Sequence, residues 1–299
     1  MAANLYTHRD LNIRKTWFLF AAFLVFVIGI GWVFSRVYNS PGILIFAVVL
    51  SLLMNVIGYW YSDKIVLKIS KAQPIERKNA PELYNVVENL AITAGLPMPK
   101  IYLVSDASPN AFATGRDPKH AVIAVTTGLL EHLDRSELEG VMAHELSHIG
   151  NRDMLLSTAV VVLVGFIALL SDMFMRSMFW GGFGGNRDRR GGGGIITIIG
   201  IILAILSPIV AMLIQLAISR KREFLADASG ALLTHYPDGL AKALEKISIY
   251  SRPMPSANNA TAHLWISDPH AKKHGAIAKL FMTHPPIEDR VARLRGMKT

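Results

Sequence analysis

The chain contains no cysteine among its 299 residues. Disulfide bonds, cysteine-ligated metal sites and thiol nucleophiles are therefore excluded. A metal site in this chain must use histidine and carboxylate ligands, and a hydrolytic reaction must use an activated water molecule or a hydroxyl group.

Charged residues are also scarce. They make up 18% of the chain, against 52% hydrophobic residues, whereas an average soluble domain has roughly 25% charged residues. The chain is too apolar for a purely soluble enzyme. Its 31 basic and 22 acidic residues give a net charge of +9. In so apolar a chain this excess indicates attraction to anionic lipid, so we expect a lipid bilayer and no nucleic acid as partner.

A phosphate-binding loop is missing as well. The glycine-rich stretch from Trp180 to Gly194 lacks the G-x-x-x-x-G-K-[ST] pattern, and so does the rest of the chain. That pattern cradles nucleotide phosphates, so we expect no nucleotide partner. The composition of the stretch is typical of a flexible loop.

Four apolar runs are long enough to cross a hydrocarbon layer of about 30 Å as helices. They cover residues 17–34, 42–61, 154–170 and 195–218. The third run is marginal, because Asp172 lies close to its end, and a hairpin that enters the bilayer without crossing it is the alternative there. The sequence thus predicts an α-helical membrane protein with about four transmembrane helices.

These runs divide the chain into four parts. Residues 1–61 form a polar tail and a transmembrane hairpin, and residues 154–218 form a second hairpin with a Gly/Arg-rich loop at 176–194. Residues 62–153 carry regularly spaced charges and are predicted to be soluble. Residues 219–299 form a soluble segment of mainly helical pattern, predicted to complete an active site.

The first soluble segment combines strands with helices. Its patterns predict a helix over 81–94, strands over 100–105 and 120–125, an edge strand or turn at 110–115, and a helix over 135–151. Strands that precede a long helix indicate a mainly helical α+β domain.

Two complete hairpins place the tail and both soluble segments on one side of the membrane. Basic residues near the runs indicate the side, because they are enriched in cytoplasmic segments. The larger set belongs to the tail and the soluble segments, and includes Arg14, Lys15, Lys64, Arg152 and Arg220. The arginines of the glycine-rich loop favour the opposite orientation, but they are fewer. We therefore predict that both soluble segments are cytoplasmic.

An H-E-x-x-H motif lies at residues 144–148. On a helix, His144 and His148 share one face and can offer two imidazole nitrogens to one metal ion. A catalytic zinc ion typically takes three protein ligands and keeps a position for water, whose pKa it lowers from about 15.7 to about 7. Glu145 is placed to take a proton from that water as a general base.

A second pair of acids follows the last apolar run. Glu223 and Asp227 are four residues apart and share a helical face. Glu223 could supply the third ligand, and Asp227 could accept the free N–H of a ligand histidine. The alternative is a solvent-exposed charge cluster of Glu223 with residues 220–222.

These motifs together resemble the HtpX family of bacterial membrane zinc metalloproteases, which is related to the CaaX protease Ste24 and the mitochondrial protease OMA1. The resemblance rests on His144-Glu-x-x-His148, Glu223-x-x-x-Asp227, Asn110-Ala-Phe-Ala-Thr-Gly115 and Thr283-His-Pro-Pro286, in this order. It covers nearly the whole chain, apart from the Gly/Arg-rich loop. It implies a zincin-like domain of the gluzincin type in the bacterial inner membrane.

The resemblance also implies residue roles. His144, His148 and Glu223 match the zinc ligands, Glu145 matches the catalytic base, and Asp227 matches the carboxylate behind a ligand. By the same resemblance, Asn110 and Ala111 bind an extended substrate at a sheet edge, with an ordinary turn as the alternative. His284 and Arg290 match a position near the reacting carbonyl, where either could stabilise the oxyanion; a capping or packing role is the alternative.

The remaining histidines have no comparable partner spacing, and we expect them at the surface or at interfaces. They are His120, His132, His235, His263, His270 and His274.

The leading functional hypothesis is a membrane zinc endopeptidase. By resemblance, its substrates are misfolded or damaged membrane proteins, cut without ATP. A site-2-type intramembrane protease is disfavoured, because charged residues bracket the motif. A CaaX-type protease, and a non-catalytic scaffold or chaperone whose zinc ties two segments together, are the alternatives. The scaffold would leave Glu145 without a role.

Overall fold

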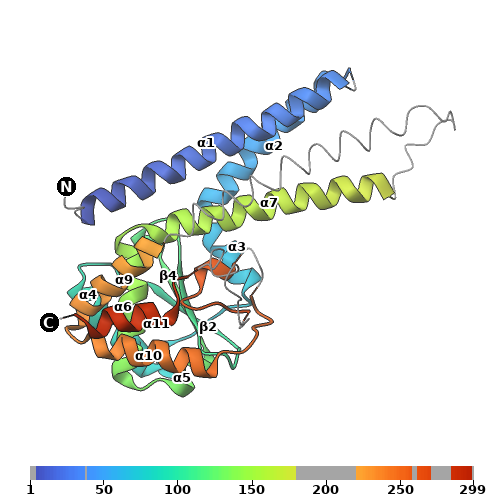
Figure 1. Ribbon diagram of the computed structural model, residues 1–299. Helices are drawn as coiled ribbons and strands as arrows, with labels where there is room; N and C mark the ends of the chain where they lie inside the picture. Colours follow the sequence, from blue (N-terminus) through green and yellow to red (C-terminus); the bar gives the residue numbers. More distant parts are fainter. Residues whose placement is uncertain (1–4, 38, 180–219, 258–260, 271–283, 298–299) are drawn as a thin grey trace.

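A computed structural model describes residues 5–37, 39–179, 220–257, 261–270 and 284–297. Long helices extend from an α+β domain that contains the C-terminal part of the chain (Figure 1). The second arm of the second predicted hairpin, the glycine-rich stretch and His274 lie outside the described residues.

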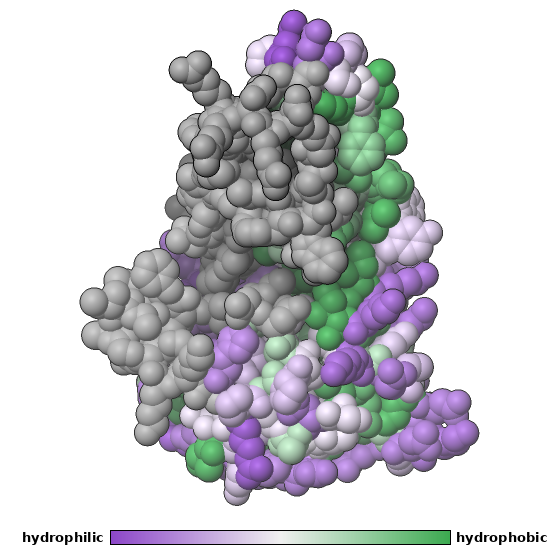
Figure 2. Space-filling view, turned by 90° about the vertical axis from the view of Figure 1, so that its right-hand side faces the viewer, coloured by the Kyte–Doolittle hydropathy of each residue, from purple (hydrophilic) through white to green (hydrophobic). Residues whose placement is uncertain are grey.

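Helices α1 (Leu5–Val37) and α2 (Pro41–Trp60) are long and apolar enough to cross a membrane. They pack with α7 (Asp153–Phe179) around a common apolar cluster. In Figure 2, hydrophobic residues form a band along the right-hand side of the upper part of the molecule, above a mainly hydrophilic lower part. Exposed apolar side chains of α1 and α2 include Trp17, Phe18, Ile45, Phe46 and Leu52. The first predicted hairpin is therefore present.

Helix α7 begins almost directly after the motif helix α6 (Arg135–Gly150) and makes an angle of 79° with it. Taken together, the two are apolar enough to form one broken span, so the described residues contain two candidate spans, or three with this pair. Because α6 packs inside the α+β domain, we treat it as part of that domain.

Helix α1 starts at Leu5, within the stretch predicted as a polar tail. Two of its polar side chains are buried, Asn12 at 3% exposure and Thr16 at 1%. The Thr16 hydroxyl donates to the Asn12 carbonyl (2.9 Å), and the Asn12 amide bonds to the start of α7. Tertiary contacts thus extend the helix beyond its apolar part.

The domain contains a mixed four-stranded sheet of order β1-β2-β4-β3. Strands β2 (Lys100–Val104) and β4 (Val122–Thr126) are parallel, whereas β1 (Gln73–Pro74) and β3 (Ala111–Thr114) pair antiparallel at the two edges. Since side chains alternate along a strand, β4 buries residues on both faces of the sheet. The predicted α+β domain is confirmed, and β3 is an edge strand.

Helices cover both faces of this sheet. One face packs against α4 (Pro81–Thr93), α6 and α10 (Pro237–Tyr250), and the core there includes Val86, Ile123, Val125, Met142 and Leu244. The other packs against α3 (Ser62–Ile69), the start of α7 and Trp265. The remaining helical elements are α5 (Thr127–His132), α9 (Arg220–Thr234), α11 (Ile287–Arg295) and the 3₁₀ turns Arg77–Asn79, Pro118–His120 and Ala262–Leu264.

Two glycines let neighbouring helices approach α6 closely. A Cβ atom on Gly140 of α6 would lie 2.6 Å from the Leu240 backbone nitrogen of α10. A Cβ atom on Gly230 of α9 would lie 3.0 Å from the His144 backbone nitrogen. Gly230 follows Glu223 by seven residues and Asp227 by three, so it shares their helical face. The close approach therefore brings both acids to the motif.

Candidate active site

Helix α6 presents the H-E-x-x-H motif inside the domain. Its first turn is fixed by a capping box between Asp134 and Glu137. One helical turn separates His144 and His148, and their Nε2 atoms are 3.2 Å apart. Two imidazole nitrogens this close, on side chains that are largely shielded from water, form a site for a shared ligand.

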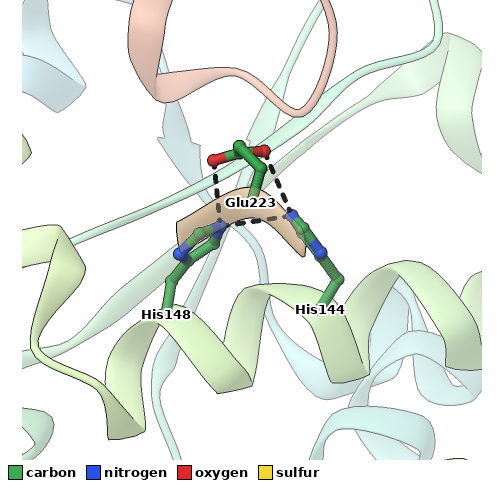
Figure 3. Close-up of side chains that lie close together, drawn as sticks. All are labelled: His144, His148 and Glu223. Carbon is green, nitrogen blue, oxygen red and sulfur yellow. Dashed lines mark hydrogen bonds and ion pairs between the residues drawn. The ribbon is translucent and has the colours of Figure 1, made fainter. Parts of the chain in front are cut away.

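Helix α9 contributes the third group. The carboxylate of Glu223 lies across the two imidazoles (Figure 3), with Oε2 3.9 Å from His144 Nε2 and Oε1 3.6 Å from His148 Nε2. These three residues could hold a metal ion. The sequence predicted that Glu223 would join His144 and His148, some eighty positions earlier, and the geometry agrees with this prediction.

The distances fit a tetrahedral metal site. Ligand bonds of about 2.0–2.1 Å at tetrahedral angles separate the donor atoms by roughly 3.3 Å. The two nitrogens are 3.2 Å apart, and a different oxygen of Glu223 faces each of them, at 3.9 Å from His144 Nε2 and 3.6 Å from His148 Nε2. Two histidines and one carboxylate leave a fourth position for a water molecule, which is the donor set of a catalytic site rather than a closed structural one.

Each histidine is held by a carboxylate on its far nitrogen. Asp227 Oδ1 lies 3.0 Å from His144 Nδ1, and Asp153 Oδ2 lies 3.0 Å from His148 Nδ1. Carboxylates in this position fix the tautomer and the ring orientation, so that Nε2 is available to the metal. Asp227 was predicted in this place. Asp153 was not, because its spacing from His148 is set by the turn between α6 and α7.

The two histidines differ in their protonation. Burial lowers the pKa of His144 to about 4, which keeps the ring neutral, as a metal ligand must be. At His148 burial also lowers the pKa, but the hydrogen bond with Asp153 and the charge of Glu223 outweigh it and raise the pKa to about 9. The acids around His148 therefore make this part of the site favourable for a cation.

Arg290 of α11 is completely buried beside the site. Its Nε and Nη2 atoms donate to the two oxygens of Asp227 (2.9 and 2.7 Å), and Nη1 donates to the Ile266 carbonyl (2.9 Å). Burial raises the pKa of Asp227, but the charge of Arg290 outweighs it and lowers the pKa to about 2. This geometry favours a role in holding Asp227, and direct contact of Arg290 with an oxyanion stays a prediction.

Glu145 is 2% exposed and lines the cavity beside the three candidate ligands. Burial raises its pKa to about 7; the charge of His148 opposes this shift, and the charge of Glu223 adds to it. A carboxylate whose pKa lies near neutral pH can both accept and return a proton, as a general base requires.

His284 contacts the third candidate ligand. Its Nδ1 atom lies 3.1 Å from Glu223 Oε2, and its Nε2 atom is buried without a hydrogen-bond partner among the described residues. Burial raises the pKa of Glu223, but the charge of His284 and its hydrogen bond outweigh this effect and hold the pKa well below its usual value. His284 also lines the cavity, so it can reach a substrate, although its catalytic role stays a prediction.

His263 also lines this cavity. It is 7% exposed, and its Nε2 atom lies 3.2 Å from the Ser157 carbonyl. The expectation of a surface or interface position was therefore wrong for this histidine. Burial lowers its pKa to about 4, so the ring is neutral. Nothing in its sequence spacing marks it, because its neighbours at the site come from α6, α7 and α9.

Asn110 and Ala111 are engaged by another part of the same chain. The Asn110 amide donates to the Ser267 carbonyl (3.1 Å) and accepts from the Ser267 N–H (3.3 Å), and the Ala111 carbonyl accepts from the Ile266 N–H (2.9 Å). Asn110 is 1% exposed. In this structure, the outer edge of β3 at Ala111 is thus paired with residues 266–267, and substrate binding by these two residues stays a prediction.

We expect Asn110→Ala to lower the free energy of unfolding by about 2 kcal/mol, because it leaves two buried backbone groups of Ser267 without partners. The Michaelis constant should change little. Thermal unfolding and cleavage kinetics of the purified variant test this, with Asn89→Ala, an exposed change on α4, as the control. A raised Michaelis constant at unchanged stability would instead support the substrate role.

Comparisons with known proteins show the family of the chain. The model of Peptidase family M48 matches residues 77–298. A "Protease HtpX homolog" of Caldanaerobacter subterraneus subsp. tengcongensis is 48% identical over 298 residues, which is 98% of each chain. One of Tropheryma whipplei (strain Twist) is 45% identical over 293 residues, which is 98% of each chain.

A solved structure shares the fold. The crystal structure of S. mikatae Ste24p superposes with a TM-score of 0.52 at 20% sequence identity, and the match covers 94% of this chain and 66% of that one. The family match spans the motif helix, strands β2, β3 and β4, and all three candidate ligands. The chain therefore belongs to peptidase family M48 and is a membrane metalloprotease, similar over its full length to proteins named HtpX.

Proposed function

We propose that His144, His148 and Glu223 hold a zinc ion and that the protein is a zinc endopeptidase. The single observation that carries this proposal is the approach of one donor atom from each of the three residues to within 4.8 Å of the other two. Two imidazoles and a carboxylate are the ligands of known catalytic zinc sites. When bound, zinc would act as a Lewis acid on the scissile carbonyl and make water acidic enough to be activated near neutral pH.

Glu145 would then carry the proton transfers. Its carboxylate takes a proton from the attacking water and returns it to the leaving amine, so it ends the reaction unchanged. Its pKa of about 7 suits both transfers. His284, whose Nε2 is unpartnered, would donate to the oxygen of the tetrahedral intermediate.

We propose misfolded or damaged membrane proteins as substrates, cut without ATP on the cytoplasmic side. The site supports a membrane substrate, because the carboxylate behind His148 is the first residue of α7, which packs against the two membrane-length helices. The excess of basic residues near the soluble segments supports the cytoplasmic side. The role in protein quality control is what the motif resemblance to the HtpX family implies.

Removal of the metal tests the proposed function. We expect a chelator to abolish cleavage of unfolded casein by the purified full-length protein, and stoichiometric zinc to restore it, in the absence of nucleotide. Zinc content and cleavage are measured on the same samples.

Other outcomes would separate the alternatives. Bound zinc without cleavage of any protein would favour the scaffold. Strong preference for a prenylated tail peptide over casein would favour a CaaX-type protease. Restoration only by a different metal would contradict the assignment of zinc.

A further inference from the structure

The N-terminal helix α1 contributes a buried amide to the region behind the candidate metal site. The Asn12 Nδ2 group donates to the Asn151 carbonyl (3.1 Å) and to Asp153 Oδ1 (2.7 Å). All three residues are at most 6% exposed. In Figure 1, the N-terminal end of α1 lies near the start of α7, where these residues meet. A helical residue 139 positions away in sequence is thus bonded directly to the end of the motif helix.

Asp153 links this amide to a candidate ligand. Its Oδ1 atom accepts from Asn12, and its Oδ2 atom pairs with His148 Nδ1 (3.0 Å). A buried carboxylate is costly unless its oxygens are hydrogen-bonded. Asn12 therefore does two things at once, because it stabilises the charge of Asp153 and fixes the plane of the carboxylate that faces His148.

The backbone between α6 and α7 has an unfavourable conformation that the hydrogen bond from Asn12 stabilises. Arg152, between α6 and α7, has a φ of +59°, a left-handed conformation that is unfavourable for a residue other than glycine. The adjacent carbonyl of Asn151 is at the end of α6, where no further helical turn is available to bond it. The Asn12 amide satisfies this carbonyl and thereby holds the 79° bend that brings Asp153 beneath His148.

We propose that Asn12 is a positioning residue of the metal site, which acts through Asp153 to hold the His148 ring in the orientation that binds the ion. The N-terminal membrane helix is on this view a component of the catalytic apparatus as well as an anchor. This inference rests on the proposed function of His148 as a metal ligand.

The test is zinc affinity, measured by competition with a chromophoric chelator on full-length protein in detergent. Asn12→Leu keeps the size of the side chain and removes its hydrogen bonds. We expect zinc to bind about 10- to 100-fold more weakly, as is typical when a group behind a ligand is lost. Asn12→Asp, which places a second carboxylate against Asp153, should weaken binding at least as much without a change in volume. If Asn12→Leu does not fold, the zinc affinity of Asn12→Asp tests the proposal.

A matched control comes from α2. The Asn55 amide donates to the Phe20 carbonyl of α1 (3.2 Å). Asn55→Leu therefore removes a hydrogen bond to α1, the helix that carries Asn12, and leaves the contacts of Asp153 unchanged. Zinc affinity should then change by less than about 2-fold. Equal effects of the Asn12 and Asn55 changes would overturn the proposal, because they would reflect general loosening of α1.

A double-mutant cycle tests whether Asn12 affects zinc binding through Asp153. If Asn12 acts through Asp153, the double variant Asn12→Leu/Asp153→Ala should bind zinc no more weakly than Asp153→Ala alone. Additive losses would overturn the proposal. A failure of the proposed function is distinguishable, because His148→Ala would then leave zinc binding unchanged in the otherwise unaltered protein.

Discussion

Glu145→Gln is expected to lower the rate of peptide-bond cleavage by about 1,000-fold while the bound zinc is retained. General acid–base groups typically contribute about 100- to 10,000-fold to a rate, and glutamine has nearly the shape of glutamate but cannot accept the proton. Zinc should remain, because Glu145 is not among the three groups that face one another across the site. Cleavage of casein and zinc content of the purified variant are the measurements.

The control for this variant is Glu131→Gln, which removes the same charge from an exposed position on α5. It should leave both quantities unchanged. Casein cleavage by Glu145→Gln at the rate of the unaltered protein would remove Glu145 from the mechanism. Loss of zinc together with activity would mean that Glu145 helps to bind the ion.

Glu223→Gln should weaken zinc binding by at least about 100-fold and abolish cleavage at limiting zinc. Structural zinc sites bind with about 10–16 kcal/mol, which for four ligands is roughly 3 kcal/mol each, and 1.4 kcal/mol corresponds to a factor of ten. A neutral amide oxygen loses the charge interaction with the ion. It also loses the charge that pairs with His284. Chelator competition gives the affinity directly.

The zinc affinities of two further variants test whether the loss is specific to Glu223. Asp227→Asn should weaken binding less than Glu223→Gln, because Asp227 touches His144 and not the ion site itself. Glu288→Gln, at an exposed position on α11, should have no effect. An unchanged zinc affinity for Glu223→Gln would show that the third ligand comes from elsewhere.

The centre of this site is predictable because its geometry is local. A spacing of four residues on a helix places His144 and His148 together without reference to the rest of the fold. The same spacing places Glu223 and Asp227 on one face of α9. That α9 would meet α6 could not be derived from these spacings; it was inferred from the need of the motif for a third ligand and from the resemblance to a family. The structural reason is the contact at Gly230, which depends on how the two helices pack.

The remaining groups depend on tertiary contacts that leave no periodic signal. Asp153 reaches His148 through a left-handed residue and a bend, and His263 enters the cavity from a 3₁₀ turn. Asn12 lies in a stretch whose polarity suggested a tail. The pairing of Asn110 with Ser267 joins segments more than 150 residues apart. Asp153 is only five residues from His148, but the bend that joins them has no periodic pattern. In the other cases the partner is distant in sequence, and neither composition nor periodicity encodes it.

The bend between α6 and α7 also connects the candidate metal site to the packing of the membrane-length helices. Helices tilt when their hydrophobic length exceeds that of the surrounding lipid, and α7 shares its apolar packing with α1 and α2. The first residue of α7, Asp153, contacts His148 directly. A change in the tilt of α7 would therefore move the carboxylate that orients this candidate ligand.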